Sequence, residues 1–583
     1  MLIRALLLCL VTLFSSTTLV MADSTSVRMH IESIFVQTGQ DHLLRINGID
    51  IASQIVLPAL YKKRDFEPVW SNELSVIQYM EILKHINEDG LTASDYHFDE
   101  INAIREQLWQ NEQRDATLRA EYDILLTDSL VRLGYHLLVG KVDPVELDSH
   151  WNMDHTVGKL DRVLDLANAI DVGRMDDLID VLRPRFHIYA NLKAALKRYR
   201  GIEATGGWEE INTGETLRPG MTDPRIISIR KRLISTGDYS GEDHDAIAYD
   251  ADLIDAVMKF QYRHGMEADG LVGKGTIRVM NIPVEQKIEK IRVNLERARW
   301  ALHDLPEKFV LADIAGFSVS LYQNGNAIWS TRAQVGQPFR KTPIFRSEIR
   351  YLVLNPTWTV PPTILEEDIL PKIHTDPDYL LRKNLRVLDF SGNPVDESTI
   401  DWSLYPDTKF PYMLRQDPGP GGALGRVKFI FPNEYSVYLH DTPYRSLFKS
   451  TERAFSSGCI RIEKPYELAR LLLDDPEKWS EASIVEAIDL LETANVSLPE
   501  PMTVILFYWT TTIDDEGNVM FRPDIYERDA AISKGLASRF RFREKPILDQ
   551  DAVPGESSLE KKLKHSLFSP FNSAAMSSPD SIH

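Results

Sequence analysis

The sequence predicts an α+β multidomain protein with a helical scaffold, a small three-helix module, and a mostly β domain that contains helices and an insertion. Three observations predict this fold class. Apolar residues recur at helical spacing between about residues 54 and 200. A glycine- and threonine-rich stretch, 201–220, then reads as a linker. After Trp300 the periodicity changes to the alternation typical of β-strands, and 583 residues provide enough chain for three or four domains.

The N-terminus has the pattern of a secretory signal. Arg4 precedes the apolar run ALLLCLVTLF, and the sequence VMA at 20–22 offers a cleavage site. The apolar run has about ten residues, fewer than a bilayer-spanning helix needs. We therefore expect residues 1–22 to be a signal peptide and the protein to be exported. An uncleaved anchor that associates with the inner membrane is the alternative.

The charge balance bears on the partners. Lys and Arg total 66 against 86 for Asp and Glu, and the net charge is −20. Nucleic-acid-binding proteins usually carry a basic surface. The sequence therefore gives no reason to expect a nucleic-acid partner.

The helical scaffold is expected over residues 23–215. Its clearest segment is EYDILLTDSLVRLGYHLLVGKVDP, in which leucines recur mostly at intervals of three to five residues. These leucines are Leu125, Leu130, Leu133, Leu137 and Leu138. We expect this domain to be architectural.

Residues 216–283 form the predicted three-helix module. Asp223 before Pro224, and Asp250 before the next apolar run, are helix start signals. The segment resembles the small three-helix peptidoglycan-binding domain of many bacterial wall enzymes. The resemblance rests on Asp223, Pro224, Leu233, Tyr249, Phe260, Gln261, His264, Gly265, Asp269, Gly270, Gly273 and Thr276. A helical bundle whose glycines only end helices is the simpler interpretation.

After a connecting helix at 284–305, a strand-rich domain is expected over 306–530. FSVSLYQ and NAIWST flank an Asn324-Gly325 pair, which predicts a hairpin with a type I′ turn. RYLVLNP, KFIF, YSVYLH and TVILFYW predict further strands. The charged, proline-punctuated segment at about 364–415 interrupts them, and insertions of this length are often lids. Residues 531–583 are expected to be a disordered tail.

Only two cysteines occur in the chain, and Cys9 lies in the predicted signal. If the signal is removed, Cys459 is unpaired in an exported protein, where cysteines normally form disulfides. A buried, inert thiol is one interpretation of Cys459. The other is a reactive nucleophile.

The surroundings of Cys459 favour chemistry. Gly458 permits a backbone conformation closed to other residues, and KPYELARLLLDD predicts a following helix with Pro465 in its first turn. A thiol near a helix N-terminus and beside Arg461 should have a depressed pKa. In YSVYLH (435–440), strand alternation places His440 on the face opposite the core, where it can act as the base.

These residues resemble the L,D-transpeptidase catalytic domain. Its motif is a histidine, a spacer, and Ser/Thr-x-Gly-Cys-hydrophobic-Arg/Asn. Here it reads His440, fifteen residues, then SSGCIR at 456–461. RKTPIF, NPTWTVPPT and PGPGGALGRVKF occur in the order that the family uses. Most members have histidine where this chain has Ser457, and serine there is similar to the large Gram-negative subset with a scaffold, a wall-binding module and a lid.

The resemblance implies a substrate and a reaction. Cys459 attacks the third residue of a peptidoglycan stem peptide, usually meso-diaminopimelate, and a tetrapeptide donor loses its terminal D-alanine. A diaminopimelate-containing acceptor then takes the acyl group to give a 3→3 cross-link. Carbapenems would acylate the same thiol. The location implied is the periplasm of a Gram-negative bacterium, and the chemistry requires no metal and no organic cofactor.

The resemblance and the residue chemistry together assign candidate roles. Cys459 is the nucleophile and His440 the general base and acid. Backbone N–H groups of Gly458 and Cys459, with Tyr438, are candidate oxyanion donors, and the backbone carbonyl of Asp441 is expected to orient the histidine. The candidate substrate-binding residues are Arg461, Ser456, Ser457 and Trp358, although Arg461 can instead brace the loop.

Several alternatives stay open. An L,D-carboxypeptidase shares the first half-reaction and uses water as the acceptor. A non-catalytic peptidoglycan-binding protein would use only the module. Papain-like enzymes place cysteine before histidine, and sortases space the two residues differently, so both are disfavoured. Neither the acceptor nor the mobility of the insertion follows from the sequence.

Overall fold

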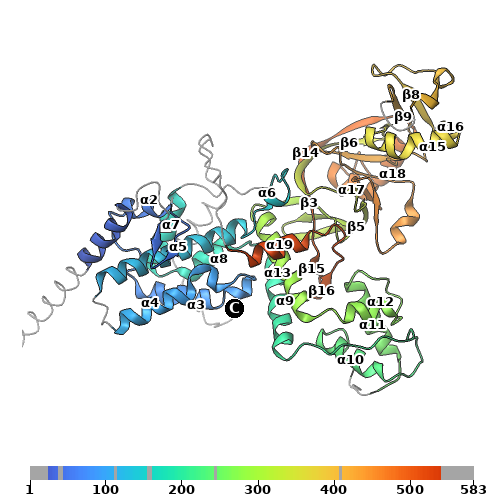
Figure 1. Cartoon of the computed structure of the whole chain (residues 1–583). Coiled ribbons are helices and arrows are strands. Elements are labelled where there is room, and N and C mark those ends of the chain that lie inside the picture. The colour runs from blue at the N-terminus through green and yellow to red at the C-terminus, as the bar shows by residue number, and fades with distance from the viewer. Residues whose placement is uncertain are drawn as a thin grey trace, which may run out of the picture.

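The computed structural model describes residues 24–539, except 37–43, 55, 111–114, 154–159, 242–245 and 406–409. The predicted signal and Cys9 lie outside these residues, as does the chain beyond residue 539. Figure 1 shows a helical body, a strand-rich domain and a small helical module joined through a central helix. The α+β multidomain class predicted from the sequence is confirmed.

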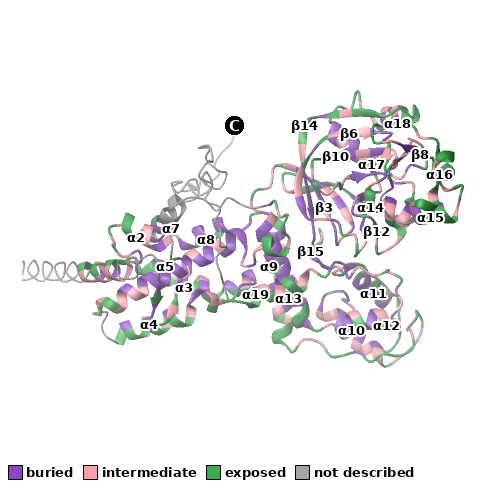
Figure 2. Ribbon diagram, turned by 45° about the horizontal axis from the view of Figure 1, so that its top comes forward, coloured by how far each residue is buried: buried purple, intermediate pink, exposed green. Residues whose placement is uncertain are grey.

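The scaffold is a helical bundle built around one long buried helix. Its main helices are α2 (Val56–Lys63), α3 (Glu73–Lys84), α4 (Phe98–Gln110), α5 (Ala116–Val139), α6 (Pro144–Leu147), α7 (Leu160–Val172), α8 (Met175–Leu182) and α9 (His187–Ala204). Asp115 caps α5 by accepting a hydrogen bond from the Leu118 N–H at 3.0 Å. Most of α5 is buried, as its purple colour in Figure 2 shows. None of the helices in the described part of the chain combines the length and hydrophobicity needed to traverse a bilayer.

The module consists of α10 (Arg225–Ser235), α11 (Ala251–Arg263) and α12 (Lys274–Met280) around a core of its own. The carboxylate of Asp250 accepts a hydrogen bond from the Leu253 N–H and caps α11. The module contacts the hairpin of β15 (Thr511–Ile513) and β16 (Val519–Phe521) in the strand-rich domain. His264 stacks on Phe521 with 5.5 Å between ring centroids, and Arg263 donates to the Val519 carbonyl at 3.3 Å.

The strand-rich domain is a closed sheet. Its strands are β3 (Lys308–Asp313), β4 (Ser318–Gln323), β5 (Asn326–Gly336), β6 (Phe345–Leu354), β10 (Val427–Ile430), β11 (Leu439–His440), β12 (Ala454–Ser456), β13 (Ile460–Ile462) and β14 (Ala494–Phe507). Their order is β12-β5-β13-β11-β10-β6-β14-β3-β4, and β4 also pairs with β5, which closes the sheet. Asn324 and Gly325 both have positive φ, so the predicted type I′ turn is confirmed. Helices α17 (Pro465–Leu473) and α18 (Glu481–Asp489) cover the sheet.

The insertion is a small folded unit at the far end of the strand-rich domain (Figure 1). It contains α14 (Pro362–Ile364), a π-helix η3 (Leu365–Ile369), α15 (Leu370–Thr375), α16 (Tyr379–Arg382), β8 (Leu385–Leu388) and β9 (Met413–Gln416). Together with β7 (Trp358–Thr359), its strands form a separate sheet in the order β7-β9-β8. Ten buried apolar residues give it a core of its own.

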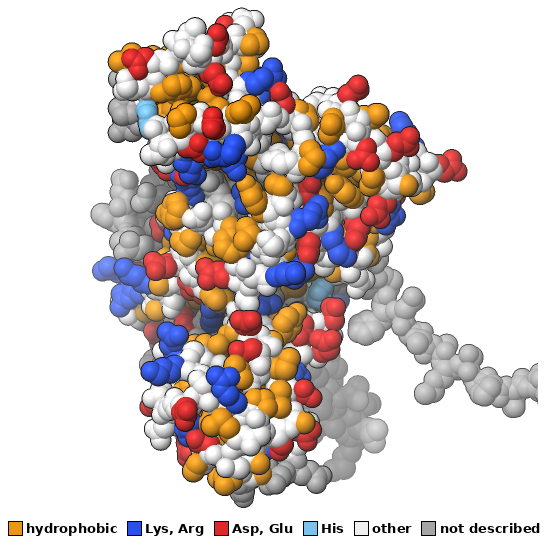
Figure 3. Space-filling view, turned by 90° about the vertical axis from the view of Figure 1, so that its right-hand side faces the viewer, with side chains coloured by type: hydrophobic (Ala, Val, Ile, Leu, Met, Phe, Trp, Pro, Cys, Tyr) orange, Lys and Arg blue, Asp and Glu red, His pale blue; other side chains and the backbone are white. Residues whose placement is uncertain are grey.

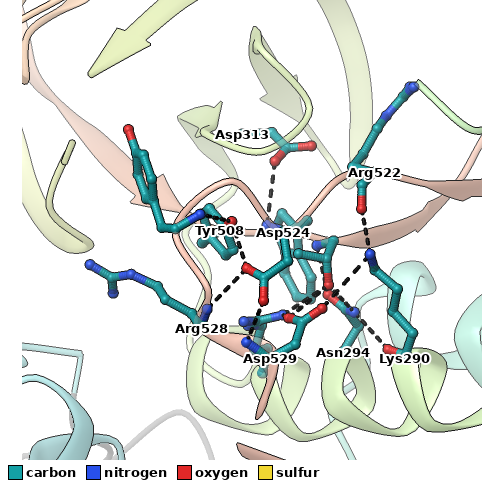
Figure 4. A network of polar contacts seen from close by, with 12 residues as sticks. Lys290, Asn294, Asp313, Tyr508, Arg522, Asp524, Arg528 and Asp529 are labelled. Atoms are coloured by element: carbon teal, nitrogen blue, oxygen red, sulfur yellow. Dashed lines mark hydrogen bonds and ion pairs between the residues drawn. The ribbon is translucent and has the colours of Figure 1, made fainter. Parts of the chain in front are cut away.

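A polar network ties the central helix α13 (Val284–Ala301) to the C-terminal helix α19 (Asp529–Ala537) and to the loop after β14 (Figure 4). Asn294 exchanges two hydrogen bonds with Thr510, at 2.8 and 3.0 Å. Arg297 donates to the Asp529 carboxylate at 2.6 Å, and its guanidinium is buried. The network therefore holds the central helix, the C-terminal helix and the loop after β14 together.

Two sequence predictions are wrong in detail. The expected strand 435–440 is strand only at Leu439–His440, because the Asn433 amide bonds the backbone of Tyr435 and Val437 and holds a loop. Ser436 in this loop has a φ of 55°. The tail expected from residue 531 begins instead as the last seven residues of α19, whose apolar side chains pack against α13.

Candidate active site

Cys459 lies in a tight turn between β12 and β13. The buried hydroxyl of Ser456 donates to the Cys459 carbonyl at 2.6 Å and accepts from the Gly458 N–H at 3.1 Å. Gly458 has a φ of 113°, and a Cβ there would meet no atom closer than 3.6 Å. Glycine is thus required by the backbone conformation rather than by space. The turn presents the thiol at the edge of two strands.

His440 reaches the same place from the neighbouring strand. β11 and β13 are parallel, with Leu439 opposite Ile460 and His440 opposite Arg461. Cys459 therefore lies beside the residue that precedes Leu439, which is Tyr438. The His440 side chain is only 3% exposed, and its Nδ1 lies 2.5 Å from the Asp441 carbonyl oxygen. Because a carbonyl only accepts, Nδ1 carries the proton and Nε2 keeps the lone pair of a base.

The resting pair is uncharged. Burial is the main cause that raises the pKa of the Cys459 thiol, against a backbone hydrogen bond from Tyr438 and the nearby cations. Burial, and then the Arg461 cation, lower the pKa of His440 to about 3. The thiol donates to the Ser436 carbonyl at 3.7 Å. The depressed thiol pKa expected from the sequence is therefore wrong, because desolvation outweighs the helix and the cations.

Models of three protein families match the chain. Residues 56–196 match the Scaffold domain, residues 222–280 match the "Putative peptidoglycan binding domain", and residues 307–482 match the L,D-transpeptidase catalytic domain. The region that matches the catalytic domain contains β5, His440 and the turn that carries Cys459. A curated "Putative L,D-transpeptidase" of Haemophilus influenzae is 37% identical over 245 residues. Residues 307–482 are therefore similar to the L,D-transpeptidase catalytic domain.

The extent of these similarities differs. The match to the Haemophilus influenzae protein covers 42% of this chain and 49% of that one, so the chain spans about half the length of this relative. An L,D-transpeptidase structure from Mycobacterium smegmatis is 15% identical, with a TM-score of 0.17, and the match covers 34% of this chain and 58% of that one. One from Xylanimonas cellulosilytica is 14% identical, with a TM-score of 0.16 and coverage of 51% and 99%. These TM-scores are too low to carry an argument about the fold.

Two of the candidate roles at this site do not agree with the structure. The Gly458 N–H already donates to Ser456 Oγ, so it is not free for an oxyanion. Ser456 is 1% exposed and both of its bonds stay within the turn, so it shapes the loop and does not reach substrate. A serine can close such a turn because its short hydroxyl both donates and accepts.

Ser457, where the chain departs from the commoner transpeptidase motif, is exposed and joins the turn to the insertion. Arg340, in the loop after β5, donates to Ser457 Oγ at 2.9 Å. The same guanidinium pairs with Glu367 and Asp368 of the π-helix, both at 2.5 Å. Arg340 therefore bridges the insertion and the nucleophile turn. The sequence gives no local sign of this bridge because the partners of Arg340 are 27 to 117 residues away along the chain.

The remaining candidate site residues lie around the turn that carries Cys459. Arg461 donates to the Gln334 amide oxygen at 3.3 Å, and its Nε is buried without a partner among the described residues. Trp358 belongs to the sheet of the insertion, opposite Gln416, and packs against the core of that unit. Lys428, which the sequence analysis missed, lies 3.8 Å above the Tyr438 ring.

The outer face of this region is mixed in charge. Figure 3 shows the end of the molecule that carries the insertion above and the module below, and acidic, basic and hydrophobic side chains are interspersed between them. Within the described residues, no three His, Cys, Asp or Glu side chains gather as a metal site would require.

Proposed function

We propose that this chain is an L,D-transpeptidase that cross-links peptidoglycan stem peptides through a thioester on Cys459. The observation that carries the proposal is the pairing of β11 with β13. This pairing brings Cys459 and a carbonyl-oriented His440 to adjacent strands, inside the region that matches the catalytic-domain model. The peptidoglycan-binding match at 222–280 supports the same polymer as substrate.

The first half-reaction forms the thioester. Nε2 of His440 accepts the thiol proton, and the sulfur attacks the carbonyl carbon of the third stem residue. The Cys459 N–H and the Tyr438 hydroxyl are the donors nearest to the developing oxyanion. The C–N bond to the terminal D-alanine breaks as His440 returns the proton to the leaving amine. Because the thiol is neutral at rest, proton transfer must accompany attack.

The second half-reaction transfers the acyl group. An acceptor amine, most simply the side chain of a second diaminopimelate, attacks the thioester and passes its proton to His440. The C–S bond breaks, a 3→3 amide forms, and the thiol is restored. Water in place of the amine would make the chain an L,D-carboxypeptidase. We place the protein in the periplasm of a Gram-negative bacterium on the signal pattern of its first 22 residues.

The test is incubation with purified tetrapeptide muropeptides, followed by mass spectrometry. Cross-linked dimers with loss of one D-alanine are expected, and Cys459→Ala is expected to give none. Tripeptide alone would reassign the chain to the carboxypeptidases. Unchanged substrate, together with no mass increase after meropenem treatment, would leave only a wall-binding role.

A further inference from the structure

Lys428 shares a sheet face with the catalytic histidine. β10 and β11 are antiparallel, and Lys428 lies directly opposite His440 in their register. Directly opposed residues project to the same side of a sheet. Arg461 lies opposite His440 on the other side, and Gln334 lies opposite Arg461. A row of two cations and one imidazole therefore crosses the sheet at the nucleophile.

The position of Lys428 is specific. Its ammonium lies 3.8 Å from the centroid of the Tyr438 ring, within the range of a cation–π contact. The side chain is half-buried, and burial lowers the pKa of Lys428 while the Cys459 thiolate raises it. No ion pair or hydrogen bond joins Lys428 to another side chain among the described residues. Among the described residues, the Tyr438 ring and the Cys459 thiolate are the groups that offset the desolvation of the ammonium.

The negative charge that would balance the Lys428 ammonium arises only during the reaction. Arg461, the other cation of the row, is held by a neutral amide oxygen, and among the described residues no carboxylate pairs with either cation. The ionisable groups around Lys428 are His440, Cys459, Tyr438 and, beside Tyr438, Tyr351. Burial disfavours the charged forms of His440, Cys459 and Tyr438. Negative charge develops on the sulfur and then on the substrate oxygen beside Tyr438.

We propose that Lys428 is a positioning and electrostatic residue of the active site, which fixes the Tyr438 ring and stabilises the thiolate of Cys459 and the oxyanion that follows. The inference concerns the same site and rests on the proposed function. Lys428 acts through Tyr438 and through its field, and it forms no bond with substrate. The Lys428 cation, directly opposite His440 on the next strand, also disfavours a protonated His440. The proton is therefore readily returned to the leaving amine.

The experiment measures the rate at which iodoacetamide alkylates Cys459 in the full chain between pH 6 and pH 10. The variants are Lys428→Met, Lys428→Arg and, as a matched control, Lys478→Met. Lys478 is exposed and also lies over an aromatic ring, that of Trp479, at 5.4 Å. Alkylation follows the thiolate fraction. It therefore reports the field at the sulfur even if the chain has no transpeptidase activity.

Loss of the Lys428 charge is expected to raise the midpoint of the alkylation profile by about one pH unit, since an opposite charge at close range shifts a pKa by about 1 to 3 units. Alkylation below the midpoint then slows about tenfold. Lys428→Arg should keep most of the wild-type midpoint, and Lys478→Met all of it. The inference is overturned if Lys428→Met keeps the wild-type midpoint, or if Lys428→Arg moves it as far as methionine does.

A second measurement separates folding from electrostatics. Lys428→Arg and Lys428→Met are compared for melting temperature and for the rate of acylation by meropenem. An equal melting temperature with slower acylation only in Lys428→Met supports the charge. Equal acylation rates in Lys428→Arg and Lys428→Met reject a role for the Lys428 charge. Failure of the wild-type chain to be acylated would count against the proposed function and leave the alkylation result intact.

Discussion

Acidification is expected to weaken the fold through His440. The folded-state pKa of this imidazole is about 3, whereas a histidine in an unfolded chain titrates near about 6.5. Between these values the unfolded chain binds a proton that the folded chain does not. The free energy of unfolding therefore falls as the pH falls from about 6.5 to about 3.

The magnitude follows from the size of the shift. Each pH unit within this window costs about 1.4 kcal/mol, so at pH 5 His440 alone should remove about 2 kcal/mol. The imidazole is 3% exposed and faces Lys428 and Arg461 across the strands, so solvent does little to relieve the charge. Histidine to glutamine removes the titration and keeps a donor for the Asp441 carbonyl.

The assay compares urea denaturation of the wild type and His440→Gln at pH 7.5 and pH 5, for the transition of the strand-rich domain. The wild type should lose about 2 kcal/mol more than the variant. His374→Gln, at an exposed position in the insertion, is the control and should track the wild type. Parallel losses in wild type and His440→Gln, or a histidine NMR signal from His440 that titrates near pH 6.5, would refute the reasoning.

Three further predictions concern the nucleophile, the insertion and a buried acid. Cys459→Ser should lose cross-linking by at least about 10³-fold, because a hydroxyl is a far weaker nucleophile, with a melting temperature close to wild type; appreciable dimer formation in the mass spectrum would exclude the thioester. Arg340→Gln should weaken the attachment of the insertion by about 1 kcal/mol, the scale of an ion pair whose carboxylates are exposed, and limited proteolysis within 364–415 should accelerate about fivefold; an unchanged rate would mean that Arg340 does not hold the insertion. Burial raises the pKa of Asp313 to about 6, so its folded form resists ionisation and stability is lost as the pH rises from about 4 to about 6. Asp313→Asn keeps the single oxygen that accepts from both Gly316 and Trp509, and it should raise the urea midpoint at pH 7.5; a lower midpoint would show that the carboxylate is needed as a charge.

The sequence alone predicted the elements whose structure is set by a few neighbouring residues. The turn at Asn324-Gly325, the cap at Asp250 and the helix that starts at Pro465 each depend on a few adjacent residues. The closeness of Cys459 and His440 was predicted instead from a family resemblance, because eighteen intervening residues permit many geometries.

What the sequence could not supply depends on contacts between distant segments. The raised pKa of the thiol is a consequence of desolvation by residues from distant segments, which no local pattern reports. Lys428 becomes part of the site only through the register of β10 with β11. The loop at 435–438 forms because one asparagine amide satisfies the backbone, although the residue pattern there favours a strand.

The last described helix, α19, fastens distant parts of the chain to one another. Ile532 and Leu536 of α19 share a small apolar cluster with Val142 of the scaffold, and the Lys141 ammonium donates to the Leu536 carbonyl at 2.7 Å. Synthesis proceeds from the N-terminus, so this contact forms only after Cys459 and His440 have been made. A chain cut short before residue 529 would carry Cys459 and His440 but lack the piece that fastens scaffold to catalytic domain.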